Sequence, residues 1–146
     1  PPVRILATDI DTAVLQVAAR GVYPLERVAG LEMARKRRFF QRGTGANEGL
    51  CRVRPELRAL VEFRPLNLLD RDYGLRPDSC AAVFCRNVMI YFDKPTQYQV
   101  LRRIAPLLGR EGRLYTGHSE SFGHAADVVA PCGRTVYRAV DAGDAR

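Results

Sequence analysis

The chain has 146 residues, of which 47% are hydrophobic and 27% are charged, a composition typical of one globular domain with a real core. No apolar run approaches the roughly 20 residues that cross a bilayer, and the start, PPVRILATDI, lacks the basic and then apolar layout of a signal peptide. We therefore expect a soluble, cytoplasmic protein without membrane insertion.

The formal net charge is +7, which raises the question of a nucleic-acid partner. Much of this charge lies in ARKRRFFQR (34–42) and in scattered arginines, and no RNA-binding aromatic motif adjoins it. A solvated helix face or a surface for an acidic protein partner explains the charge better. The sequence therefore predicts no nucleic-acid partner.

The cysteines show no metal-binding spacing. Cys51, Cys80, Cys85 and Cys132 form no CxxC pair, and only two histidines are present. The pattern favours reduced thiols that pack as small hydrophobic groups, and it predicts no metal site.

The chain begins with a strand and a helix. VRILATDI (3–10) is β-rich, and DTAVLQVAARG (11–21) has helical spacing, with Asp11 or Thr12 as a cap and Gly21 as a stop. A second unit of this kind comes later: AAVFC (81–85) is typical of a buried strand, and the run from 94 to 112 predicts a helix with Pro95 in its first turn. Strand-like runs at 112–119 and 134–140 complete an α/β pattern with a mainly parallel sheet.

A different kind of segment separates these two units. LEMARKRRFF (31–40) is basic and helical, QRGTGANEG (41–49) is rich in glycine, and residues 50–67 resemble one or two extended segments. No helix follows the glycines, so a phosphate-binding loop is disfavoured. We expect a hairpin with a flexible tip, inserted at about 41–64 as a small antiparallel β-subdomain beside the main sheet.

Polar residues follow two of the expected strands. In open α/β sheets, ligands bind beyond the carboxyl ends of the strands, where an acid often holds a ribose hydroxyl. Asp9 has such a position, although a simple turn or helix cap would also explain it. Arg86 and Asn87 follow the strand at 81–85, and burying them without partners would be costly. A nucleoside-containing cofactor site is thus the leading interpretation.

Five motifs in this order carry a more specific signal: ATDIDTAVL, RGTGANEGLCRVR, NLLD, FCRNVMIYFDK and GHSES. Together they resemble the chemotaxis receptor glutamate O-methyltransferases, the CheR family, over residues 4–140. The resemblance implies a Rossmann-like methyltransferase sheet with an inserted antiparallel β-subdomain. It also implies S-adenosyl-L-methionine as methyl donor, S-adenosyl-L-homocysteine as product, and chemoreceptor glutamates as substrates that become γ-glutamyl methyl esters.

The resemblance also assigns roles to residues. Asp9 would hold the ribose, Asn67 and Leu68 would border the adenine, and Cys85 and Arg86 would line the crevice around the cofactor. Tyr91 would face the methyl-transfer site, with Arg86 as a second orienting group. In some members the β-subdomain binds a peptide at the receptor's C-terminus as an added strand. The matching positions are Arg42, Gly43, Gly45, Gly49 and Arg52.

Glycines let another backbone approach a hairpin closely, and arginines suit an acidic peptide. A mobile tip is the alternative for residues 43–49. His118 in GHSES lies either near the site or on a surface loop.

The chain departs from the family pattern at its start. Members carry a helical N-terminal domain, then a first strand and a glycine-rich cofactor loop, and none of these precedes Pro1. The resemblance therefore implies a partial sheet, the C-terminal part of a methyltransferase domain. Such a fragment exposes sheet edge and apolar surface, so we expect self-association. An inactive module that only docks on chemoreceptors is the alternative function.

Overall fold

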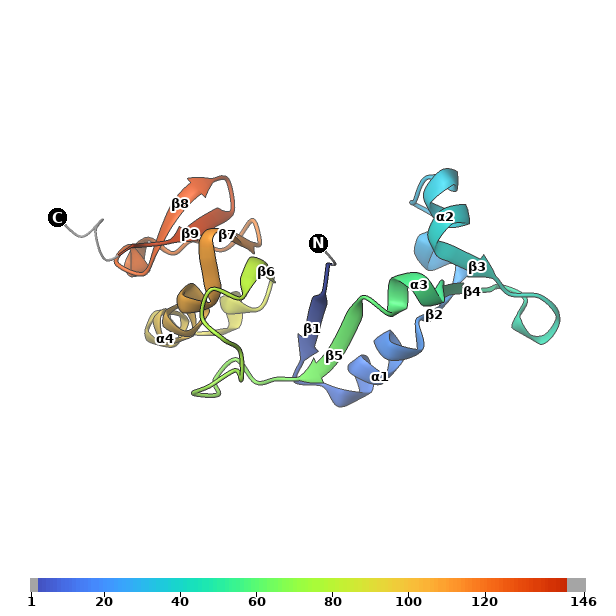
Figure 1. Cartoon of the computed structure of the whole chain (residues 1–146), viewed down its shortest axis with the longest axis horizontal. Coiled ribbons are helices and arrows are strands. Elements are labelled where there is room, and N and C mark those ends of the chain that lie inside the picture. Colours follow the sequence, from blue (N-terminus) through green and yellow to red (C-terminus); the bar gives the residue numbers. More distant parts are fainter. Residues whose placement is uncertain (1–2, 142–146) are drawn as a thin grey trace. The chain divides into compact units, whose positions relative to one another are not determined.

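The computed structural model describes residues 3–141 (Figure 1). By its internal contacts the chain divides into two compact units, Pro1–Asn67 and Leu68–Arg146. The first unit holds a parallel strand pair and a small antiparallel sheet, and the second holds a mixed sheet of four strands.

In the first unit, β1 (Ile5–Asp9) pairs in parallel with β5 (Val61–Pro65), and Asp9 lies opposite Pro65. Between them in sequence, α1 (Thr12–Arg20) begins at Asp11, whose Oδ1 accepts the N–H groups of Ala13 at 2.9 Å and Val14 at 3.3 Å. The helix ends at Gly21, whose φ of 64° is the left-handed conformation that glycine adopts without strain. The predicted strand and helix are confirmed, and Asp11 is the cap.

The small antiparallel sheet of the first unit has the order β2-β4-β3. Its strands are β2 (Val22–Pro24), β3 (Phe40–Arg42) and β4 (Leu50–Val53). A short turn of helix, η1 (Leu25–Val28), follows β2, and α2 (Met33–Phe39) leads directly into β3. A further turn, η2 (Gly45–Asn47), lies at the tip of the β3–β4 hairpin, and α3 (Pro55–Arg58) follows β4.

The bounds of this sheet differ from the predicted insertion at about 41–64. The sheet begins at Val22, and the extended segment at Val61–Pro65 pairs with β1 instead. A strand of three residues is too short to show a periodic pattern, and the pattern of a strand does not name its partner. The basic helix before the hairpin and two extended segments after the glycines are as predicted.

The second unit is a four-stranded sheet of order β6-β7-β9-β8. Its strands are β6 (Cys80–Cys85), β7 (Leu108–Thr116), β8 (Val129–Gly133) and β9 (Val136–Ala139). The β6–β7 pair is parallel, and β9 pairs antiparallel with both β7 and β8. Between β6 and β7 run η3 (Met89–Tyr91), α4 (Lys94–Ile104) and η4 (Ala105–Leu107), and η5 (Gly123–Ala125) precedes β8. Side chains from α4, the sheet and η5 fill its core: Val100, Leu101, Ile104, Leu114, Ala125 and Val129.

Two predictions about this unit were wrong in detail. The helix predicted over 94–112 ends at Ile104, because Pro106 has no N–H to continue the helical bonds, and Leu108 begins β7. Strand β8 was not predicted, since VAPCG contains a proline and a glycine that weaken a strand pattern. The α/β class itself, with a helix joining parallel strands in each unit, is confirmed.

Candidate functional site

The polar residues that follow β6, Arg86 and Asn87, lie in an exposed loop. Cys85, the last residue of β6, is buried, whereas Arg86 and Asn87 are exposed. Asn87 has a φ of 59°, a left-handed conformation that asparagine tolerates better than most residues. The chain therefore turns sharply out of the sheet at the carboxyl end of β6, and Tyr91, in η3, is 81% exposed.

A buried carboxylate fixes this loop. Glu120 is only 7% exposed, and its Oε1 accepts the N–H of Met89 at 3.0 Å while its Oε2 accepts the N–H of Gly117 at 2.6 Å. From the other side, Nε2 of Gln97 in α4 donates to the carbonyl oxygens of Met89 at 2.8 Å and Phe92 at 3.1 Å. Residues 88–92 are thus tied both to the loop after β7 and to α4.

Gly117 brings the two loops together. A Cβ at this position would lie 2.6 Å from Oδ1 of Asn87 and 3.2 Å from Oε2 of Glu120, closer than side-chain carbons pack. Any other residue at 117 would displace Asn87 or break the Glu120 bond. His118 and Ser119, which follow, are exposed.

Tyr73 links two further predicted residues in the second unit. Its hydroxyl donates to the carbonyl oxygen of Leu68 at 2.7 Å, and Nη1 of Arg103 lies 3.5 Å from the same oxygen. Burial raises the pKa of Tyr73, an effect that Arg103 opposes and nearby Cys85 reinforces. Tyr73 therefore holds the backbone at Leu68, and Cys85 lies near enough to influence its pKa.

Cys85 is a buried neutral thiol. Burial, and secondarily the Glu120 carboxylate, raises its pKa from 9.0 to about 11. Since the thiolate is the nucleophilic form, Cys85 is not a nucleophile at neutral pH. Its position fits a contact or packing role only.

The carboxyl end of the β1–β5 pair, in the first unit, holds Asp9 and Asn67. Asp9 is half-buried, its Oδ1 accepts the N–H of Asp11 at 2.9 Å, and its carbonyl oxygen accepts the N–H of Leu66 at 3.0 Å. Oδ2 has no hydrogen-bond partner among residues 3–141. Asp9 thus forms the local turn and also keeps an acceptor oxygen for a hydroxyl group. Asn67, also half-buried, follows β5 by two residues.

The predicted peptide-contact residues all lie on the β3–β4 hairpin. Arg42 ends β3 and is exposed, and Nη2 of Arg52 on β4 donates to Oε1 of Gln41 at 2.9 Å. Gly45 and Gly49 have φ values of 57° and 84°, and a Cβ at Gly43 would lie 2.0 Å from the carbonyl oxygen of Asn47. The glycines are therefore needed to build the tip, whether or not a peptide binds there.

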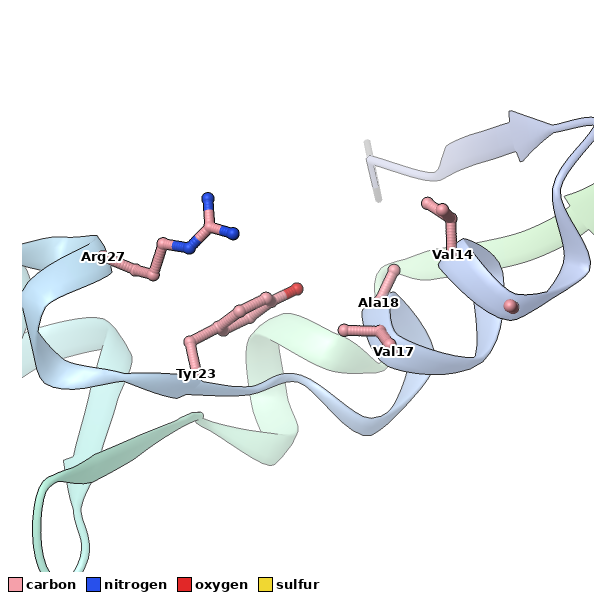
Figure 2. Close-up of a pocket in the computed structure, with 6 residues that line it drawn as sticks. Val14, Val17, Ala18, Tyr23 and Arg27 are labelled. Atoms are coloured by element: carbon pink, nitrogen blue, oxygen red, sulfur yellow. The ribbon is translucent and has the colours of Figure 1, made fainter.

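A separate apolar groove of about 410 Å³ is lined by residues of α1, β2 and η1. Figure 2 shows Val14, Val17 and Ala18 projecting from the helix beside the ring of Tyr23, with Arg27 at the far side. None of the predicted site residues lines this groove.

Residues 3–141 contain neither a membrane-crossing helix nor a cluster of metal-binding side chains. No helix there is long and apolar enough to cross a membrane. No group of three or more histidine, cysteine or acidic side chains is placed to hold a metal ion.

Comparison with known families then decides the relationship. Residues 2–138 match the family described as CheR methyltransferase, SAM binding domain. The chain belongs to this family.

The curated relatives agree. The chain is 56% identical over 137 residues to chemotaxis protein methyltransferase 2 of Pseudomonas aeruginosa, covering 94% of this chain and 49% of the relative. It is 49% identical over 134 residues to the chemotaxis protein methyltransferase of Escherichia coli, covering 92% of this chain and 46% of the relative. The chain thus spans about half the length of the curated relatives that it matches.

A solved structure gives a weaker likeness. The trans-methyltransferase CalH in complex with SAH matches 90% of this chain and 25% of its own chain, at 19% identity and a TM-score of 0.45. This similarity is too low to support a conclusion about the fold or the site.

S-adenosylmethionine is the cofactor of the CheR domain family, and in the first unit the chemistry of Asp9 fits a nucleoside. Asp9 keeps a free acceptor oxygen at the carboxyl end of β1, where a ribose hydroxyl can donate to it. Taken by itself, the second unit has Cys85 and Arg86 at the turn out of β6, and the carbonyl oxygen of Leu68 accepts a hydrogen bond from Tyr73.

Sequence reasoning missed the residues that position this loop. No role was assigned to Glu120, Gln97 or Tyr73 from the sequence. The first two bond the backbone of Met89, near Arg86 and Tyr91 in sequence, and Tyr73 bonds the backbone of Leu68. One signal was available for Glu120: it is an acid in GHSES just before the apolar Phe122. A lone acid near an apolar residue is not enough to identify a buried hydrogen-bond acceptor.

Proposed function

We propose that this chain is the C-terminal part of an enzyme that methylates glutamate side chains on the cytoplasmic helices of bacterial chemoreceptors, in the cytoplasm. The observation that carries the proposal is the 56% identity over 137 residues to a chemotaxis protein methyltransferase. The products would be γ-glutamyl methyl esters and S-adenosyl-L-homocysteine.

The chain's residues would act by binding and orientation. S-adenosylmethionine, when bound, supplies an electrophilic methyl group. Asp9 would accept a hydrogen bond from the ribose, Asn67 and Leu68 would border the adenine, and Cys85 and Arg86 would border the rest of the cofactor. Because a glutamate carboxylate with a pKa near 4.3 is already ionised at neutral pH, no strong general base is needed.

Tyr91 and Arg86 would orient the reacting groups. Both belong to the loop that Glu120 and Gln97 hold in place, and both are exposed, so they are available to a substrate. Holding two reactants in a productive geometry is worth roughly 7 to 11 kcal/mol, and a fixed loop supports such positioning.

The β-subdomain would bind the receptor as an added strand. Strand β3 is one edge of the small sheet, and β2, the other edge, contains Pro24, which has no N–H to donate. Arg42, Gly43, Gly45, Gly49 and Arg52 would contact a peptide added to the β3 edge.

Methyl transfer from tritiated S-adenosylmethionine to receptor-containing membranes tests the proposal. Base-labile tritium in the receptor band, together with saturable binding of S-adenosylhomocysteine in calorimetry, is the expected result. Receptor binding by this chain without either signal would contradict it and favour a docking module.

Two substitutions sharpen this experiment. Asp9→Asn should weaken S-adenosylhomocysteine binding about tenfold, whereas Asp72→Asn, which alters a similar turn carboxylate that accepts the N–H of Gly74, should not. Tyr91→Phe should lower the rate of methyl transfer about tenfold without changing cofactor affinity. Because the Tyr91 side chain is 81% exposed, this change has little effect on folding, and Tyr23→Phe is its control.

A further inference from the structure

The helix that leads into the β3 edge carries a cluster of exposed arginines with no acidic partner. Arg35, Arg37 and Arg38 of α2 are exposed. None of these guanidinium groups has a carboxylate within ion-pair distance among residues 3–141, and Glu32 at the start of the helix forms no ion pair with them. We call these three residues the α2 arginine cluster.

Structural roles account for only part of this cluster. Lys36, the remaining cation of the helix, is half-buried and donates to the carbonyl oxygen of Ala29 at 3.0 Å, so it has a structural bond. Arg38 lies over the Phe39 ring at 5.3 Å, but this contact needs only one cation. Nη2 of Arg54 donates to the backbone carbonyl oxygen of Arg37 at 3.1 Å, which places a further guanidinium beside the backbone of the last turn of α2. Arg37 and Arg38 lie in the last turn of α2, where the helix dipole favours cations, but Arg35 lies outside that turn, and like charges this close together repel.

The position of the cluster points to a polypeptide partner. Helix α2 ends at Phe39 and β3 begins at Phe40, so the helix that carries the cluster leads into one end of an edge strand (Figure 1). A chain that pairs with β3 therefore passes next to α2 when it continues beyond Phe40. Guanidinium groups pair with carboxylates through parallel hydrogen bonds, so aspartate or glutamate side chains suit this place.

Other polyanions fit less well. Each residue turns an α-helix by about 100°, so Arg35 and Arg38 lie on one side of α2 and Arg37 lies on another. A flat membrane surface therefore meets only part of the cluster, while a peptide can bend around the helix. Single-stranded nucleic acid is usually held by stacking on exposed aromatic rings, and none of the large hydrophobic side chains exposed within 3–67 is aromatic.

We infer that the α2 arginine cluster binds a run of acidic side chains in a partner protein, in a segment that continues from the strand added to β3. This deepens the receptor-binding part of the proposed function and rests on it for the identity of the partner and for the strand added to β3. The cluster would add affinity and salt dependence to a peptide that the β3 edge alone holds by its backbone.

Binding of a fluorescein-labelled octaglutamate peptide to this chain, followed by fluorescence anisotropy, tests the inference. Octaglutamine with the same label is the uncharged comparison. We expect octaglutamate to bind more tightly than octaglutamine and to weaken as salt rises to about 0.15 M. The triple variant Arg35→Gln, Arg37→Gln, Arg38→Gln should raise the Kd for octaglutamate about tenfold.

A matched variant separates the cluster from the overall positive charge. Arg71→Gln, Arg76→Gln and Arg134→Gln together remove the same charge from exposed positions outside α2, and should leave the Kd within about twofold. Circular dichroism of both variants checks folding, which glutamine, a good helix former, should preserve.

Three outcomes would overturn the inference. They are equal weakening by the two triple variants, equal binding of octaglutamate and octaglutamine, and tighter α2-dependent binding to phosphatidylglycerol vesicles or duplex DNA than to octaglutamate. Because neither cofactor nor receptor is present, a failure here is distinct from a failure of methyl transfer.

Discussion

The loop after β6 and the tip of the β3–β4 hairpin are both surface segments with predicted functions, but they are held in different ways. In the loop, side chains of Glu120 and Gln97 bond the backbone of residues 89–92. In the hairpin tip, backbone bonds dominate, such as Gly43 N–H to the Leu50 carbonyl oxygen at 2.9 Å. The loop is therefore held by neighbouring elements, whereas the tip holds itself.

This difference matches the work proposed for each segment. Transfer of a methyl group depends on orientation, so the loop with Arg86 and Tyr91 gains from side chains that fix its backbone. Pairing with a peptide requires an accessible edge, so glycines and local turns suit the tip because they leave β3 uncovered. Changes to the loop should therefore act through a few side chains, and changes to the tip through the backbone.

The largest effect is expected for Glu120→Ala. This change leaves the N–H groups of Met89 and Gly117 without a buried acceptor, and each bond to a charged group is worth about 1.5 to 3 kcal/mol. The free energy of unfolding of the second unit should fall by about 4 kcal/mol, with faster amide exchange at residues 86–92. Urea unfolding and hydrogen exchange measure both. Ser119→Ala, an exposed neighbour, should change neither, and slow exchange in the Glu120→Ala loop would refute the role of the carboxylate.

Gly43→Ala should have the next largest effect, and in the hairpin only. Its Cβ would lie 2.0 Å from the carbonyl oxygen of Asn47, and a backbone atom cannot move away as a side chain can, so a loss of about 2 kcal/mol is expected. Gly30→Ala is the matched control, because no atom lies within 4 Å of its Cβ. Hydrogen exchange at residues 42–50 should rise for Gly43→Ala alone. Faster exchange at residues 86–92 in this variant would contradict the independence of the two segments.

A smaller effect is expected from the Cys85 thiol at high pH. Its pKa is about 11 in the folded chain and 9.0 ordinarily, so the fold favours the neutral thiol. This contribution is complete below pH 9 and is lost as pH rises to about 11, which lowers the free energy of unfolding by about 2 kcal/mol. Between pH 8 and pH 11, the free energy of unfolding measured in urea should therefore fall less for Cys85→Ala than for the parent chain. Cys132→Ala, at an exposed thiol, should behave like the parent, and an unchanged loss in Cys85→Ala would exclude burial of the thiol as the cause.

Local patterns predicted much of the fold, and specific motifs predicted the family and proposed the residues of the candidate site. The helix from Asp11 to Gly21 follows from a cap, an apolar face and a stop, all within one short segment. The partner of Val61–Pro65 could not be predicted, because strand pairing depends on residues far away in sequence. Glu120 was missed for the same reason: its acceptor role depends on Met89, 31 residues earlier. Roles for Asp9, Arg86 and Tyr91 were assigned through motifs and stay predictions, and the motifs did not reveal the contacts that hold the loop after β6.

The smallest predicted effect concerns Tyr73, which holds the chain at Leu68 much as Glu120 holds the loop after β6. Tyr73→Phe removes the hydroxyl that donates to the Leu68 carbonyl oxygen at 2.7 Å but keeps the buried ring, so the free energy of unfolding should fall by about 1 kcal/mol. Tyr23→Phe is the control, since its hydroxyl makes no hydrogen bond among residues 3–141. Because Arg103 also approaches the Leu68 oxygen, at 3.5 Å, the double variant Tyr73→Phe, Arg103→Gln should lose more than the sum of the single losses. Simple additivity in urea unfolding would show that the two donors do not share this carbonyl.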